Sequence, residues 1–318
     1  MKYVFKLTKL KVKLIFFNYL AIKGKYFIQP VRIIEGTGSE VIDFLNRIST
    51  NELMSLKPGQ TTGTIFLNEK GRIIGFVKII NNFEKIWIIT GKGTENDIFR
   101  HLEKYIFNDD VKFTIRDEEF EERTVFYDDM NEYIEFRNKI INQFPFPRNF
   151  FYYPDNLYGN TFNIVISEKQ KSILTDYLED YESMSDTELE YYRISNKIPK
   201  YPNEINDKVN PLECGLEKYV SYDKGCYTGQ EVISRIDSRN KIPRTLKLFK
   251  SGYKPVKNDF IYFTQNEKET ESGYISSILE YKGEIFCLGF IRTIYFSDEN
   301  EYYTKINNSE KNKLILIN

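Results

Sequence analysis

The chain has 318 residues, 41% of them hydrophobic and 29% charged, which is an ordinary balance for two or three domains with a sizeable core. Its 45 basic and 46 acidic residues nearly cancel, so the net charge gives no reason to expect a nucleic-acid partner. Cys214, Cys226 and Cys287 form an odd set without close pairing, which disfavours a disulfide framework and favours a reducing compartment. We expect a cytoplasmic protein, with the mitochondrial matrix as the alternative in a eukaryote.

The first 25 residues are basic and carry no acid around an apolar run over residues 12–20. Lys13 and Asn18 interrupt this run, which is too short to span a bilayer, and no small-residue cleavage site marks a secretory signal. A mitochondrial presequence would also lack acids, but it prefers Arg and Ser. We expect a basic first strand or extended start, with an organellar leader as the alternative, and no membrane partner.

Alternation over residues 26–34 predicts a strand, and residues 39–48 place apolar side chains at helical spacing behind Ser39, a predicted N-cap. Turn-rich tetrapeptides then separate three strand-like runs: Thr61–Asn68, Arg72–Ile80 and Lys85–Thr90. These runs predict a meander of antiparallel strands.

The segment from Thr94 to Asp97 resembles a capping box that opens a helix over residues 94–107, and residues 111–116 return as a strand. Strand, helix, three strands, helix and strand form an α+β pattern in which helices cover one side of an antiparallel sheet. We therefore predict an α+β fold for this part of the chain.

Three prolines punctuate residues 143–154 and predict an internal boundary or a long excursion. Residues 173–189 form an acidic region with helical character, and short strands separated by polar turns follow from Arg244 onward. We divide the chain into three regions, an N-terminal α+β region, a middle α+β region and a C-terminal β-barrel: residues 1–120, 121–243 and 244–318.

The run Lys224-Gly-Cys-Tyr-Thr-Gly-Gln-Glu231 concentrates polar chemistry where a helix is predicted to begin. Gly225 and Gly229 let the backbone come close to a ligand or a neighbouring strand. Cys226 lies near Lys224 and a helix N-terminus, which favour its thiolate and make it a candidate functional thiol or soft metal ligand. The alternative is a small buried residue in a turn.

Glu231 precedes Arg235 by four residues, the spacing of a solvated helical ion pair, although an arginine here could instead bind a ligand carboxylate. His101 is the only histidine, and we expect a structural or solvated role for it. One histidine and no Cys-x-x-Cys motif argue against a self-contained zinc or cluster site, so a cluster would need Cys226 plus outside ligands.

The run 224–231 resembles the hallmark of the YgfZ-type proteins, tetrahydrofolate-binding relatives of the glycine-cleavage T-protein that help to mature iron-sulfur proteins. Weaker matches follow the family's order from about residue 26 to 296: Arg32–Gly36, Asp43–Leu45, Ser49–Asn51, Lys57–Gly59, Leu67–Ile73, Tyr192–Ile194, Pro199, Asn210–Leu216, Val220–Lys224, Gly273–Ser277 and Leu288–Arg292. The resemblance implies three domains in a ring, with a ferredoxin-like antiparallel sheet, helices and a small C-terminal barrel, and tetrahydrofolate bound in the central opening.

The resemblance also implies a set of folate-binding residues: Arg193, Glu213, Lys224, Gly225, Tyr227, Gly229, Gln230, Glu231 and Arg235. The flat pterin of folate suits Glu or Gln edges and an aromatic platform such as Tyr227. The glutamate tail of folate suits Arg or Lys. The implied partners are folate and either iron-sulfur client proteins or the cluster assembly machinery.

The chain departs from the aminomethyltransferases in the hairpin after Gly71. There they carry paired aspartates, one of which positions the folate nitrogen, whereas this chain has Gly75 and Phe76, which cannot accept a proton. The acid expected after Arg193 is likewise Ser195. We therefore expect an accessory factor in cluster assembly or repair and not a classical enzyme; the alternatives are a glycine-cleavage-type aminomethyltransferase and a folate-binding regulatory module.

Overall fold

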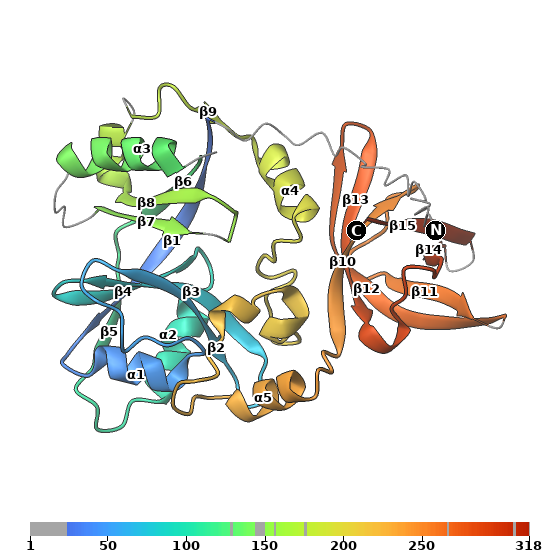
Figure 1. Ribbon diagram of the computed structural model, residues 1–318, viewed down its shortest axis with the longest axis horizontal. Coiled ribbons are helices and arrows are strands. Elements are labelled where there is room, and N and C mark those ends of the chain that lie inside the picture. Colours follow the sequence, from blue (N-terminus) through green and yellow to red (C-terminus); the bar gives the residue numbers. More distant parts are fainter. Residues whose placement is uncertain are drawn as a thin grey trace, which may run out of the picture.

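The structure is a computed structural model that describes the following residues: 24–127, 130–143, 150–155, 157–174, 177–265, 267–307 and 310–317. The basic start of the chain, residues 1–23, and residues 144–149 of the proline-punctuated segment lie outside this description. A large sheet with its helices occupies one side of the molecule, a barrel occupies the other, and α4 lies between them (Figure 1).

Within the described ranges, nine strands form the large sheet: β1 (Lys25–Thr37), β2 (Thr61–Leu67), β3 (Ile73–Asn82), β4 (Lys85–Gly91), β5 (Lys112–Ile115), β6 (Phe120–Phe126), β7 (Phe150–Asp155), β8 (Thr161–Ser167) and β9 (Glu182–Ser183). Their order is β2-β3-β4-β1-β6-β8-β7, with β5 and β9 also paired to β1. All pairs are antiparallel except β1 with β9. The long strand β1 joins two halves of the sheet, because its residues 26–31 pair with β6 and its residues 31–36 pair with β4.

The helices and 3-10 turns are α1 (Val41–Ile48), α2 (Glu95–Lys104), α3 (Met130–Gln143), η1 (Glu168–Leu174), α4 (Asp186–Ser195), η2 (Pro211–Cys214), η3 (Glu217–Tyr219), α5 (Gln230–Ser238) and η4 (Thr293–Tyr295). Helices α1 and α2 bury Phe44 and Leu102 in an apolar cluster with Ile79 of β3 and Ile88 of β4. Burial of these faces stabilises the α1–α2 side of the sheet. In the described part of the chain, no helix is long and apolar enough to cross a membrane.

The predicted N-cap Ser39 is wrong, whereas Thr94 occupies the predicted N-cap position of α2 but lacks the side-chain bond of a capping box. Helix α1 begins one residue later, after Glu40, and the Ser39 hydroxyl instead donates to Asp110 Oδ2 at 2.7 Å. Thr94 precedes α2 without capping it, because its hydroxyl donates to the carbonyl of Gly91 at 2.8 Å. In each case the hydroxyl donates to an acceptor outside the helix and does not accept a bond from a backbone N–H of the first turn.

The acidic region over residues 173–189 is not one helix. It contains the end of η1, the short strand β9 beside β1 and only the first residues of α4. Ser185 accepts a bond from the backbone N–H of Glu188, and this capping box starts α4 at Asp186. The pairing of β9 with β1 therefore separates η1 from α4, although the charge pattern of the sequence continues across both.

The barrel is closed in the order β10-β13-β12-β11-β14-β15. Its strands are β10 (Arg244–Ser251), β11 (Phe260–Gln265), β12 (Lys268–Tyr281), β13 (Glu284–Arg292), β14 (Tyr302–Ile306) and β15 (Glu310–Ile317). Closure pairs β10 with β15, so the barrel has no open edge, and Phe249, Ile261 and Tyr302 fill its core. The predicted α+β fold with an antiparallel sheet and a C-terminal barrel is confirmed.

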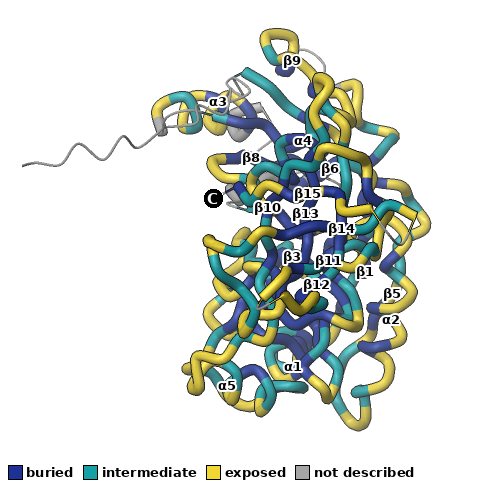
Figure 2. The backbone as a smooth tube through the Cα atoms, turned by 90° about the vertical axis from the view of Figure 1, so that its right-hand side faces the viewer, coloured by how far each residue is buried: buried dark blue, intermediate teal, exposed yellow. Residues whose placement is uncertain are grey.

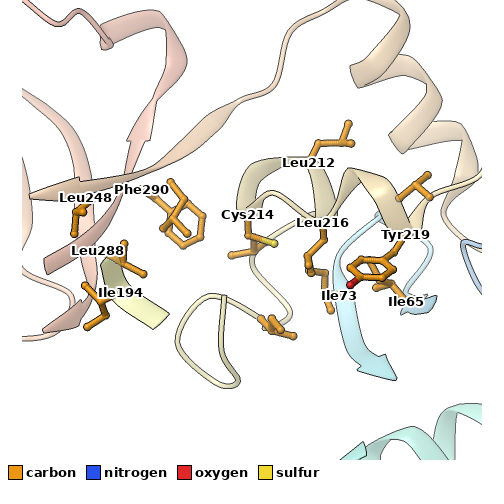
Figure 3. Close-up of a cluster of buried hydrophobic side chains, with 14 of the residues drawn as sticks. Ile65, Ile73, Ile194, Leu212, Cys214, Leu216, Tyr219, Leu248, Leu288 and Phe290 are labelled. Carbon is orange, nitrogen blue, oxygen red and sulfur yellow. The ribbon is translucent and has the colours of Figure 1, made fainter. Parts of the chain in front are cut away.

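One apolar cluster connects the β2–β3 hairpin, the segment 205–233 and the barrel. Figure 3 shows Cys214 and Leu216 between Ile73 of the sheet and Phe290 of the barrel. In Figure 2 the strands are mainly buried or intermediate, whereas α5 is exposed or intermediate apart from the buried Ile233. The sheet, the linking segment and the barrel thus share one continuous core.

Candidate functional site

A cavity of about 400 Å³ lies between the large sheet and α4. Strands β1, β3 and β4 contribute one wall, and α4 with residues 199–205 contributes the other. The volume falls within the range of roughly 300–1,000 Å³ that is typical of small-molecule sites. The fold therefore provides a central cavity large enough for a small ligand.

One face of α4 lines this cavity. Asp186, Leu189, Glu190 and Arg193 all belong to the lining, and their spacing of three and four residues places them on the same side of the helix. The capping box at Ser185 fixes the start of this helix and therefore the rotation of that face.

Arg193 is fully buried at the junction of α4 and the barrel, and the protein uses all five of its N–H donors. The five bonds are Nε to Glu190 Oε2 at 3.0 Å, Nη2 to Glu190 Oε1 at 2.6 Å, Nη2 to Ser277 at 2.8 Å, Nη1 to the Ile198 carbonyl at 2.8 Å and Nη1 to Glu204 at 3.1 Å. Burial opposes its charge, but Glu190 and Glu204 raise the pKa of Arg193 above its ordinary value. Arg193 therefore contributes a fixed wall to the cavity and has no spare donor for a ligand.

Glu190 is the carboxylate that Arg193 holds in place, and its side chain remains 22% exposed. Lys200 also donates to Glu190 Oε2, at 3.3 Å. Burial disfavours the charged form, but the two cations outweigh it and hold the pKa of Glu190 below its ordinary value. The cavity therefore contains an ionised carboxylate whose position is fixed.

The sheet side of the cavity carries a second polar group. Glu122 of β6 is 2% exposed and pairs with Lys78 of β3 at 3.0 Å. It also accepts bonds from Gln29 at 2.5 Å and from the hydroxyl of Tyr153. Three donors from the protein thus occupy the Glu122 carboxylate.

Phe76 and Lys78 lie between the central cavity and a second cavity, also of about 400 Å³. The second cavity is lined by residues of β2 and by Tyr219, whose ring centroid lies 4.7 Å from that of Phe76. The Phe76 ring is therefore an aromatic surface in contact with both cavities.

The hallmark segment is anchored through Lys224. Its ammonium group donates to three backbone carbonyls at the end of α1, those of Asn46, Ser49 and Asn51, at 2.5, 2.8 and 2.6 Å. Burial lowers the pKa of Lys224 to about 8, against the opposing effect of the Glu52 carboxylate. Lys224 thus satisfies carbonyls that the helix end leaves open and ties the hallmark segment to α1.

The turn that enters α5 packs closely against the β2–β3 hairpin. Gly229 has φ of +82°, and a Cβ there would lie 2.7 Å from the carbonyl oxygen of Asn68. Gln230 accepts a bond from the backbone N–H of Tyr227 at 3.2 Å, and the buried Tyr227 ring lies 5.3 Å from Lys224 Nζ. Gly229 is required for this close packing, and the Tyr227 ring lies under the Lys224 ammonium.

The rest of the hallmark segment is open to solvent. Cys226 is exposed, and a Cβ at Gly225 would meet no other atom within 4 Å. The predicted ion pair between Glu231 and Arg235 forms at 2.6 Å between two exposed side chains. The residues that line the two cavities come from other segments, and among the predicted site residues Arg193 contributes to the first cavity.

Glu213 lies at a second buried ionic centre. Its carboxylate has no exposed area and accepts bonds from Arg72 at 3.0 Å, from Arg244 Nε at 2.8 Å and from the backbone N–H of Asn210 at 2.9 Å. These bonds join the β2–β3 hairpin, η2 and the first barrel strand. Glu213 therefore links three parts of the fold.

Gly75 and Phe76, the positions at which the resemblance leads us to expect aspartates in an aminomethyltransferase, lie on opposite sides of β3. Gly75 belongs to the lining of the central cavity, but a Cβ there would lie 3.0 Å from Ile98 of α2, whereas Phe76 lines both cavities. The Ser195 hydroxyl oxygen is buried and has no hydrogen-bond partner among the described residues. Residues 75 and 76 therefore contribute no carboxylate to the cavities, and Ser195 is outside the lining of both.

His101, the only histidine of the sequence, lies in an aromatic environment inside the fold. His101 is buried between the rings of Phe66 and Tyr105, and burial lowers its pKa to about 4. Among the residues that the structure describes, no group of three or more His, Cys, Asp or Glu side chains could hold a metal ion.

Sequence reasoning missed Glu190, Lys78 and Glu122, and treated Phe76 only as a lost acid. Glu190 precedes Arg193 by three residues, so helical spacing could have indicated that pair. Nothing local marks Lys78 and Glu122 as neighbours, because they belong to strands far apart in the sequence.

Comparison with known proteins gives two curated relatives and a solved structure. An aminomethyltransferase of Thermoanaerobacter pseudethanolicus is 23% identical over 246 residues, covering 66% of this chain and 62% of the relative. A chloroplastic protein of Arabidopsis thaliana that is named as a transferase is 27% identical over 232 residues, covering 67% of this chain and 52% of the relative. The chain thus spans less than two thirds of either relative. No family model matches it.

The crystal structure of the glycine cleavage system aminomethyltransferase T from Bartonella henselae has the same fold. It superposes with a TM-score of 0.73 at 13% identity, covering 92% of this chain and 86% of that one. The chain is thus similar in sequence to an aminomethyltransferase and to a protein named as a transferase, and it shares the fold of the glycine cleavage system aminomethyltransferase T.

Proposed function

We propose that the chain is a YgfZ-type tetrahydrofolate-binding accessory factor for the assembly or repair of iron-sulfur clusters in client proteins. The observation that carries the proposal is the central cavity, which combines the fixed carboxylate of Glu190 and the ring of Phe76 but has no carboxylate at position 75 or 76. Such a cavity suits binding of a pterin without the acid that aminomethyl transfer requires.

The residues present fit tetrahydrofolate. A pterin offers N–H donors along one edge, which a carboxylate can accept, and a flat body that packs on an aromatic ring. Glu190 and Phe76 supply these groups from different walls of the cavity. When bound, the folate would supply one-carbon and pterin chemistry, while this chain would supply binding and orientation.

The cluster-related part of the proposal rests on the hallmark segment. Cys226 is exposed next to a turn that Lys224 and Gly229 hold rigidly against α1 and the β2–β3 hairpin. An accessible thiol on a fixed turn is able to contact a client protein, whereas a buried thiol is not. The resemblance of residues 224–231 to the family hallmark supports the same role.

Two other functions make different predictions. A glycine-cleavage-type aminomethyltransferase, the activity named for one sequence relative, would release ammonia from an aminomethylated carrier protein. A folate-binding regulatory module would bind folate tightly, and its deletion would leave cluster enzymes unaffected. Gly75 and Phe76 count against the transferase, and the exposed hallmark thiol favours the cluster factor over the regulatory module.

The deciding experiment combines calorimetric titration of the full chain with tetrahydrofolate and assays of aconitase-type activity in a deletion strain. The cluster factor predicts folate binding, reduced aconitase-type activity on deletion, and no ammonia release from an aminomethylated carrier. Absence of folate binding would refute the folate part of the proposal, and undiminished cluster enzymes would refute the cluster part.

Cys226→Ser tests the thiol directly. We expect this variant to lose rescue of the deletion strain while its tetrahydrofolate affinity and melting temperature stay at the wild-type values, because the side chain is exposed and outside the lining of the cavity. Ser238→Ala, a change at an exposed residue of α5, serves as the matched control and should rescue fully. Full rescue by Cys226→Ser under limited cluster supply would contradict a role for the thiol.

A further inference from the structure

Lys247 of β10 lies toward one end of the barrel interior, outside the lining of both cavities. It is two residues from Phe249 of the barrel core, so the alternation of side chains along a strand places both on the inner face. Gly289 is its partner across β13 and has no side chain to fill this position. The Phe296 ring, which packs against the same core, has its centroid 3.7 Å from the Lys247 ammonium nitrogen.

The ammonium group of Lys247 lacks the acceptors that other lysines of the fold have. Within the described residues it forms neither an ion pair nor a hydrogen bond, and it contacts the Phe296 ring instead. Lys224, in contrast, donates to three backbone carbonyls, and Lys250 pairs with Glu284 at 2.7 Å. The face of a ring attracts a cation but offers no oxygen to hold its protons, so the Lys247 nitrogen is not tied to an acceptor.

The surroundings of Lys247 also disfavour its charged form. Burial and, to a lesser degree, the positive charge of Lys197 lower the pKa of Lys247 below its ordinary value, against the smaller opposing effect of Asp298. Burial and a neighbouring cation are two means by which a protein makes a lysine amine nucleophilic. Because the residue stays partly exposed, a small electrophile can reach it.

We propose that Lys247 is an acylation site for small acyl phosphates, with Lys197 attracting their phosphate group. The amine of Lys247 attacks the carbonyl carbon, an amide bond forms, and the bond from that carbon to the phosphate oxygen breaks. Inorganic phosphate leaves with the proton that the amine loses. The amide is uncharged, so the modified side chain loses its electrostatic attraction to the Phe296 ring. The inference is independent of the proposed folate function.

Acetyl phosphate is the probe for this site. The full chain is incubated with it near neutral pH, and peptide mass spectrometry gives the initial rate of acetylation at each lysine. Lys282 is the matched comparison, because it is exposed but also lies beside a ring, 5.2 Å from the centroid of Tyr281. We expect Lys247 to react about fivefold faster or more, since more of its amine is uncharged. A rate at Lys247 no higher than that at Lys282 would overturn the proposal.

Lys197→Met tests the second cation. This variant should slow acetylation of Lys247 by acetyl phosphate about threefold or more, and it should slow acetylation by the uncharged ester N-hydroxysuccinimidyl acetate less, because only the phosphate donor is attracted by the lost charge. Both rates at Lys282 should stay unchanged. Equal slowing of Lys247 with the two reagents, or no slowing, would overturn the role of Lys197.

Acetylation of the wild type in concentrated urea makes the result independent of any folding defect in the variant. Unfolding removes the burial and the fixed neighbours of Lys247, so it should then react at the same rate as Lys282. A faster rate at Lys247 that persists in urea would arise from the local sequence and not from the barrel, and would overturn the proposal.

Discussion

Two buried ionic centres join other parts of the chain to the barrel, and they differ in what remains accessible. At the first, Glu213 lies between Arg72 and Arg244 and has no exposed area. At the second, Arg193 lies between Glu190 and Glu204, and Glu190 keeps part of its side chain open to the central cavity.

The difference shows that chemistry alone does not identify a binding residue. Both centres combine carboxylates with arginines, and both join α4 or η2 to a barrel strand. Removing one partner of a buried ion pair lowers stability whether or not the pair binds a ligand, because it leaves an uncompensated charge in the interior. Accessibility to the cavity distinguishes Glu190 from Glu213, so the two carboxylates should respond differently to mutation.

The largest effect is expected at the closed centre. Glu213→Ala leaves Arg72 and Arg244 facing each other without a counter-ion and removes the acceptor for the Asn210 amide, so the free energy of unfolding should fall by about 3–5 kcal/mol. Denaturant unfolding monitored by circular dichroism measures the change. A loss below about 1 kcal/mol would show that this centre contributes little to the connection between sheet and barrel.

A smaller, pH-dependent effect is expected at the open centre. Glu190→Gln should lower the free energy of unfolding by about 1–2 kcal/mol at pH 7, because Arg193 keeps Glu204 as a counter-ion. The pKa of Glu190 is lowered in the folded state, so its stabilising contribution is complete above the ordinary value of 4.5 and is lost as the pH falls through the lower folded value. The difference between wild type and variant should therefore shrink below pH 4.5; a difference that grows on acidification would contradict the lowered pKa.

Local patterns predicted much of the fold but little of the cavity. The meander β2–β4 and the barrel follow from alternation and turn residues that are close in sequence. The cavity brings Phe76, Glu122 and Glu190 together from segments that only tertiary packing unites, and no periodicity reports that arrangement. The contiguous hallmark was easy to recognise, yet its Lys224 bonds to carbonyls of α1, a partner that spacing along the chain could not reveal.

The smallest effect is expected at the exposed ion pair of the hallmark helix, which has the same charges as the buried centres but full access to water. Glu231→Ala should change the free energy of unfolding by less than about 0.5 kcal/mol, since water and salt already screen the pair with Arg235. Urea unfolding of Glu231→Ala beside Arg235→Ala and the double variant gives the coupling energy of the pair. A coupling energy close to the effect of Glu213→Ala would mean that burial does not determine how much each carboxylate contributes to the free energy of unfolding. It would contradict the contrast between the closed centre and the solvent-exposed pair.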